Sequence, residues 1–122
     1  MGVRGGAARR SPCQILRKER QGDYEVDILP PDVTPWQDHQ PVLVDDIVSS
    51  GRTLLATLEH LRTAGMPRAT CIAVHGLFAG DAYERLQQKA EVLTTDTVPH
   101  PSNAISVANA LASACREWLG KT

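Results

Sequence analysis

Two adjacent carboxylates followed closely by a hydroxyl-rich turn are the groups in this sequence best suited to chemistry. Asp45 and Asp46 come directly after the apolar run 42–44, and the segment 49–53 reads Ser-Ser-Gly-Arg-Thr. The run is too short for a helix and follows a proline, which favours a central parallel strand covered on both faces. After it come Leu54, Leu55, Leu58 and Leu61, which fall on one face of a helix. The predicted order is therefore a strand ending before the acids, a small-residue loop and a helix.

Such a loop is predicted to bind an anion, because the unpaired N–H groups of a first helical turn converge on one point with the helix dipole behind them. A phosphate monoester fits there. The hydroxyls of Ser49, Ser50 and Thr53 can donate to it, and Gly51 allows close approach of the backbone. The carboxylates repel phosphate and need hydroxyl donors or a divalent cation. The expected ligand is thus a sugar phosphate; the competing interpretation is a tight turn with two incidental acids.

Composition limits the function further. The chain has 122 residues, is 42% hydrophobic and carries a net charge of −1, which suits one modest domain and offers no basic field for nucleic acid. No apolar run approaches the ~20 residues of a membrane span, and no secretory segment begins the chain. We expect a cytoplasmic protein without nucleic-acid or membrane partners. Residues 1–6 are predicted to be disordered and residues 7–122 to form one domain.

The remaining apolar runs and turn residues predict an α/β fold with a mostly parallel sheet. Strands are expected at 13–16, 24–29, 42–44, 70–74 and 91–94, and helices at 53–61, 82–89 and 107–118. Asp81 with Glu84 should cap the second helix and Ser106 the third. The polar segment 17–23 is expected to be a mobile loop.

A family resemblance adds to this interpretation. Residues 44–53 resemble the ribose-phosphate binding loop of type I phosphoribosyltransferases and of phosphoribosyl pyrophosphate synthetases, which are ribose-phosphate diphosphokinases. Segments 73–86 and 94–99 are similar to the synthetases and not to the base-exchanging transferases. The resemblance runs from about residue 7 to 119 and covers only the C-terminal domain of that family. It implies a three-layer phosphoribosyltransferase-like fold, incomplete in this chain, and a homo-oligomer.

For the reaction, the resemblance implies transfer of the diphosphoryl group of MgATP to ribose 5-phosphate, which makes phosphoribosyl pyrophosphate. Under it, the loop 49–53 holds the 5-phosphate, while Asp45 and Asp46 engage the ribose hydroxyls and Mg²⁺. Arg52 stands where the family often has glycine, and it either adds a cation beside the phosphate or points to solvent.

A catalytic pair also follows from the resemblance. Matched by position, Lys18 and Arg20 correspond to a Lys-x-Arg pair on a flexible loop that neutralises the transferred group. The N-terminal domain, which supplies most ATP contacts in the family, has no counterpart here. We therefore expect little catalysis from this chain alone.

Two other functions stay open. A phosphoribosyltransferase would need a base-recognising surface, for which 95–103 and 32–40 are weak candidates. A non-catalytic sugar-phosphate module could instead pair with a full-length synthetase. His75 could contact nucleotide or be structural, and Asp96 with Thr97 could simply shape a turn.

Overall fold

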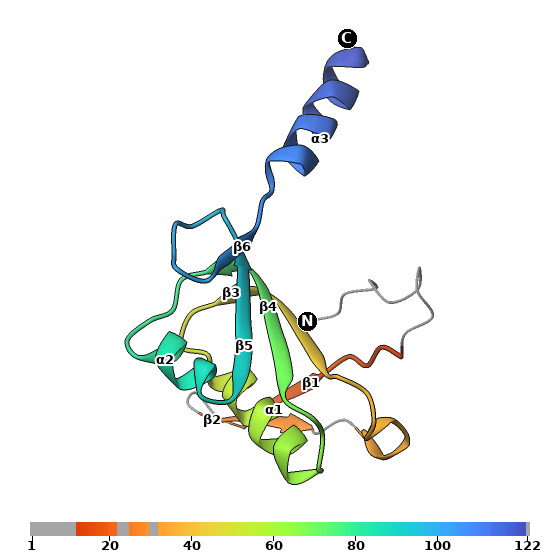
Figure 1. Ribbon diagram of the computed structural model, residues 1–122, viewed down its shortest axis with the longest axis vertical. Coiled ribbons are helices and arrows are strands. Elements are labelled where there is room, and N and C mark those ends of the chain that lie inside the picture. The colour runs from red at the N-terminus through yellow and green to blue at the C-terminus, as the bar shows by residue number, and fades with distance from the viewer. Residues whose placement is uncertain (1–11, 22–24, 30–31, 122) are drawn as a thin grey trace.

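The computed structural model describes residues 12–21, 25–29 and 32–121 (Figure 1); the start predicted to be disordered, 1–6, lies outside them. The elements in chain order are β1 (Arg17–Gln21), β2 (Glu25–Leu29), a 3₁₀ turn (Thr34–Trp36), β3 (Val42–Val48), α1 (Arg52–Thr63), β4 (Ala69–Gly76), α2 (Ala82–Gln87), β5 (Ala90–Thr95), β6 (Asn103–Ile105) and α3 (Ala108–Gly120).

The central sheet has the strand order β3-β4-β5-β6, and each neighbouring pair is parallel. Right-handed crossovers through helices are the usual way to join such strands. The carboxyl ends of all four strands therefore meet at one edge of the sheet. The predicted α/β class with a parallel sheet is confirmed.

One face of this sheet carries the core. The buried apolar residues from strands and helices form a single cluster: Leu43, Val48, Leu54, Leu55, Leu58, Leu61, Ala69, Cys71, Ala73, Phe78, Ala82, Leu86, Ala90 and Val92. The four leucines of α1 supply the helical face that the sequence predicted. Thus α1 and α2 cover the same face of the sheet.

The opposite face differs. Leu43 is 8% exposed, but Val42 is 55% exposed and Val44 37% exposed. Successive strand residues face opposite sides, so the prediction that this strand is covered on both faces is wrong for the described part of the chain. The exposed face agrees with an incomplete three-layer fold.

Several local predictions also need correction. Residues 17–21 of the supposed loop form β1, which pairs antiparallel with β2; backbone hydrogen bonds between two ribbon strands tolerate polar side chains. Residues 13–16 are not a strand. β3 continues through both acids to Val48, because β4 offers a partner as far as Gly76. β6 was not foreseen.

The helix caps agree only in part. α2 begins after Asp81 without a side-chain capping bond, so the proposed pair with Glu84 is absent. Ser106 Oγ does accept the N–H of Ala108 at 3.3 Å, although Val107 occupies the position before α3.

α3 projects from the end of β6, away from the other elements (Figure 1). None of its residues is buried, and Trp118 is 67% exposed. Its start is tied to Asp96, whose N–H donates to the Ile105 carbonyl at 3.0 Å and whose Oδ1 accepts the Val107 N–H at 3.0 Å. Among the described helices, none combines the length and apolar character that crossing a membrane requires.

Candidate functional site

The turn between β3 and α1 depends on Gly51. This residue is in the left-handed region, with φ 70° and ψ 8°, and its carbonyl accepts the N–H of Leu55 at 2.8 Å to open the helix. A side chain strains that conformation. A Cβ there would also lie 3.2 Å from Leu86 Cδ1, so a larger residue would force the leucine to shift as well as strain the backbone.

The N-terminus of α1 lacks the groups that usually satisfy it. Gly51 has no side chain to cap the first-turn amides, no other side chain does so in the described structure, and the first turn contains no acid. Ser, Thr, Asp or Asn at this position normally accepts one of these N–H groups, and acids nearby normally oppose the helix dipole. The donors and the positive end of the dipole are therefore available to an anionic ligand.

The hydroxyls predicted to bind that anion are in place around this helix end. Ser49 and Ser50 are exposed, Thr53 is half-buried, and Arg52 is exposed at the first helical position. The sequence thus correctly brought the whole segment 49–53 to one helix N-terminus. Which of these side chains contacts a ligand stays a prediction.

Asp45 and Asp46 lie in the second half of β3, immediately before this loop. Each folds back on the chain: Asp45 Oδ1 accepts the N–H of Asp46, and Asp46 Oδ1 accepts the N–H of Ile47, both at 2.8 Å. A hydrogen bond with the Asp45 carboxyl group, and then the Ile47 N–H, lower the pKa of Asp46. Asp46 is therefore ionised at neutral pH.

These oxygens suit Mg²⁺, which prefers hard oxygen ligands and often uses only one or two carboxylates together with water and substrate phosphates. Within the described ranges, no three His, Cys, Asp or Glu side chains gather as a metal site. A magnesium ion bound by Asp45 and Asp46 would accordingly take its other ligands from water and from the sugar phosphate.

The catalytic pair inferred from resemblance falls on β1. Lys18 pairs with Ile28 and Arg20 with Val26 across the hairpin. These two positions belong to a strand and not to the expected loop. Their predicted role depends on side chains that lie outside the described structure, so it stays a prediction.

The other polar residues at this edge of the sheet are joined to one another and to the backbone by hydrogen bonds. His75 Nδ1 lies 2.8 Å from Thr97 Oγ1, and Thr97 Oγ1 donates to the Val74 carbonyl at 3.1 Å. Thr95 Oγ1 donates to the same carbonyl at 2.6 Å. Asp96 supports the start of α3. These contacts favour the structural alternative for Asp96 and Thr97.

The sequence indicated that segment 73–86 resembles the synthetases, but not that the part after β4 contacts the end of β3 and the loop 49–53. The N–H groups of Leu77 and Phe78 donate to the Val48 carbonyl at 2.9 and 3.0 Å, and that of Ala79 donates to the Ser49 carbonyl at 2.8 Å. Bordering glycines at 76 and 80 mark a turn, but nothing in the sequence names its partner.

Comparison with known families gives the class of protein to which this chain belongs. Residues 15–112 match the family model described as the phosphoribosyl transferase domain, and the chain belongs to that family.

Within that family, the curated relatives that match this chain include ribose-phosphate pyrophosphokinases. Ribose-phosphate pyrophosphokinase of Pyrococcus furiosus is 35% identical over 93 residues, which are 75% of this chain and 33% of that protein. Ribose-phosphate pyrophosphokinase A of Dictyostelium discoideum is 32% identical over 114 residues, covering 84% of this chain and 35% of that protein. The chain spans about a third of the length of these relatives.

A solved structure has the same fold. The phosphoribosylpyrophosphate synthetase of Mycobacterium smegmatis superimposes with a TM-score of 0.63 at 23% identity, over 88% of this chain and 37% of that one. The chain is thus a phosphoribosyl transferase domain of the kind found in phosphoribosyl pyrophosphate synthetases.

Proposed function

We propose that this chain is the sugar-phosphate-binding domain of a ribose-phosphate diphosphokinase. The reaction moves the diphosphoryl group of ATP to the anomeric oxygen of ribose 5-phosphate. That oxygen bonds to the β-phosphorus of ATP, and the bond between the β-phosphorus and the oxygen that links it to the α-phosphate breaks. AMP leaves, and the proton of the anomeric hydroxyl is released. The names of the relatives support this choice over base exchange. An ATP-dependent reaction of this class also accounts for the Mg²⁺ requirement that we propose.

The uncapped N-terminus of α1 carries the proposal. An anion placed there receives backbone N–H donors, the dipole and the hydroxyls of Ser49, Ser50 and Thr53. The exposed guanidinium of Arg52 adds a cation at the rim. This set fixes the 5-phosphate and hence one end of the sugar.

The other end of the sugar meets the carboxylates. With the phosphate at the helix, the ribose extends toward the end of β3, where Asp45 and Asp46 accept hydrogen bonds from its hydroxyls. Bound Mg²⁺ would neutralise charge on the phosphate oxygens. Lys18 and Arg20 are proposed to stabilise the negative charge that develops on the transferred group, with Arg20 suited to forked contacts.

Titration calorimetry tests the binding. The 122-residue chain should bind ribose 5-phosphate in the presence of Mg²⁺, and Asp46→Ala or Thr53→Ala should weaken that binding. Gly120→Ala, where a Cβ meets nothing within 4 Å, is the matched control and should bind normally. No heat with the wild-type chain would refute the proposal.

A coupled assay tests the reaction. With MgATP and ribose 5-phosphate, we expect binding but slow turnover, because the match covers only about a third of each relative's length. Fast turnover would refute the need for further ATP contacts. Pyrophosphate release from the activated sugar and a nucleobase would instead favour a phosphoribosyltransferase.

The cellular setting is part of the same proposal. We propose a cytoplasmic, homo-oligomeric protein, because its substrates are soluble phosphates and the exposed Val42 and Trp118 offer apolar surface for association. Sedimentation of the purified chain tests the oligomer. A strict monomer would contradict it.

A further inference from the structure

Three hydrogen bonds attach the segment between β4 and α2 to the phosphate loop, a name used here for Val48, the last residue of β3, together with the loop 49–53. Leu77 and Phe78 donate their N–H groups to the Val48 carbonyl, and Ala79 donates to the Ser49 carbonyl, at 2.8 to 3.0 Å. No step of the proposed reaction uses these residues. Their contacts fall on the two carbonyls that lead into the turn at Gly51.

These bonds determine which way the loop amides face. In a planar trans peptide, the carbonyl of one residue and the N–H of the next point in opposite directions. A carbonyl of Val48 held toward the β4–α2 segment therefore turns the Ser49 N–H away from it, and a held Ser49 carbonyl does the same for the Ser50 N–H. The carbonyls, which would repel an anion, are kept away from the side where the amide donors point.

Phe78 keeps the segment in this conformation. Its φ is 49°, in the left-handed region that disfavours residues with a Cβ, and such a conformation persists only where the surroundings impose it. The ring is 9% exposed. Its ring centroid lies 5.1 Å from that of Tyr83 and 4.6 Å from that of His100, and the latter two rings are 4.5 Å apart. The three rings therefore form one aromatic cluster that holds the Phe78 side chain.

The space for this ring comes from Gly76. A Cβ on Gly76 would lie 2.6 Å from Phe78 Cε2 and 2.8 Å from Thr94 Cγ2. Glycine at the end of β4 thus lets the ring fold back over the strand. α2 also lies close to the turn, since a Cβ added to Gly51 would be 3.2 Å from Leu86 Cδ1.

We infer that Phe78 is a positioning residue for the phosphate site: its packed ring fixes the segment 77–79, which in turn aims the Ser49 and Ser50 amides at the ligand. The inference rests on the proposed function for the identity of the ligand, ribose 5-phosphate. The orientation of the two amides, however, can be measured without any ligand.

Phe78→Ala is the first test, with Val92→Ala as the matched control because Val92 is equally buried, 9% exposed, but lies on β5. Phe78→Ala should weaken ribose 5-phosphate binding by about tenfold or more, whereas Val92→Ala should change it less than twofold. In the ligand-free chain, the ¹H–¹⁵N signals of Ser49 and Ser50 should shift or broaden in Phe78→Ala and stay in place in Val92→Ala.

Two further variants cover the case in which Phe78→Ala does not fold. Phe78→Leu retains apolar volume and should give a smaller loss of affinity. Gly76→Ala should displace the Phe78 ring, because the new Cβ would lie 2.6 Å from Phe78 Cε2. It should therefore shift or broaden the Ser49 and Ser50 amide signals as Phe78→Ala does. Folded variants with wild-type affinity and unmoved Ser49 and Ser50 signals would overturn the inference. If the wild-type chain fails to bind ribose 5-phosphate, the proposed function falls, and the amide signals alone then decide the role of Phe78.

Discussion

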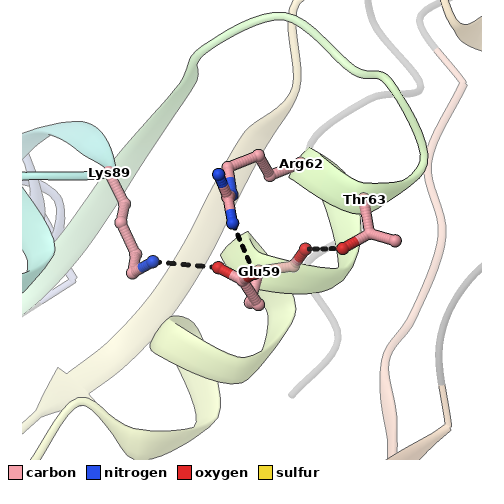
Figure 2. A network of polar contacts seen from close by, with 4 residues as sticks. All are labelled: Glu59, Arg62, Thr63 and Lys89. Atoms are coloured by element: carbon pink, nitrogen blue, oxygen red, sulfur yellow. Dashed lines mark hydrogen bonds and ion pairs between the residues drawn. The ribbon is translucent and has the colours of Figure 1, made fainter.

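The polar groups at the two ends of α1 differ in whether side chains of the protein bind them. At its N-terminus, Gly51 caps nothing, no acid lies in the first turn, and the amide donors are open to a ligand. Near its C-terminus, Glu59 is bound on two sides: Arg62 Nη2 donates to Oε1 at 2.8 Å and Lys89 Nζ to Oε2 at 2.9 Å (Figure 2). The first end has no side-chain partner for its amide donors, which is where we propose the ligand binds, and the second pairs its carboxylate within the protein.

This difference separates binding from stability along one helix. Figure 2 shows Lys89 reaching across from the segment that joins α2 to β5, and Thr63 Oγ1 donating to the Glu59 carbonyl at 2.9 Å. The Lys89 contact ties α1 to the segment before β5, whereas the Arg62 and Thr63 contacts lie within α1. Substitutions at the N-terminal end should therefore change affinity more than stability, and substitutions at the other end should do the reverse.

The strongest test removes the charge of both carboxylates. Asp45→Asn with Asp46→Asn retains their shape but loses both of the proposed charge-assisted contacts. Affinity for ribose 5-phosphate should fall by more than about 100-fold and lose its Mg²⁺ dependence. Titration calorimetry with and without Mg²⁺ measures both. A double variant that binds normally would contradict a site at this end of β3.

Gly51→Ala should have the next largest effect, and it alone should alter both properties. The new Cβ stands at φ 70° and 3.2 Å from Leu86 Cδ1, so unfolding free energy should fall by about 1 kcal/mol. The shifted loop amides should weaken binding roughly tenfold. Denaturant unfolding and calorimetry measure the two effects. Gly120→Ala is the control and should leave both unchanged; an equal loss in the control would remove the argument from backbone conformation.

Much of this contrast could be predicted from sequence, because it depends on local order. The apolar run, the glycine and the leucine spacing place a loop and a helix after β3 wherever the rest of the chain lies. The open helix end then follows from the absence of a capping residue at Gly51. The predicted class of fold and the segment 49–53 at a helix N-terminus depend on these signals.

The errors concern long-range partners. β3 extends through Asp46 because β4 supplies hydrogen bonds as far as Gly76. The prediction that the strand ends at residue 44 relied on the two charged side chains and was wrong. β1 forms because β2 pairs with it. The contact of Phe78 with the phosphate loop joins residues about thirty positions apart, and no local pattern specifies such a pair.

A smaller effect is expected for Thr53→Val, which removes one hydroxyl donor and keeps the side-chain shape. One hydrogen bond to the charged phosphate contributes roughly 1.5 kcal/mol at the low end of the range for charged acceptors, so affinity for ribose 5-phosphate should fall up to about tenfold. Thr63→Val, in the last turn of the same helix, is the matched control and should leave affinity unchanged. Equal affinity losses in both variants would mean that the two helix ends do not differ as argued.

The smallest effect belongs to Glu59→Gln, which should leave ligand affinity unchanged and alter only the acid response. Hydrogen bonds from Arg62, and then Lys89, lower the pKa of Glu59 from 4.5 to about 2. Because the folded pKa is the lower one, the contribution of Glu59 is fully present above pH 4.5 and disappears as the pH falls toward 2. Exposure and salt keep that contribution small.

Denaturant unfolding of wild type and Glu59→Gln at several pH values checks this window. The difference in unfolding free energy should be constant above about pH 5 and vanish near the folded pKa of Glu59, about 2. Added salt should shrink it at neutral pH. A difference that persists unchanged at the acid end would show that packing, not the charge, explains the role of Glu59. A change in ribose 5-phosphate affinity would show that the ion pairs also position the binding end, and the separation along α1 would fail.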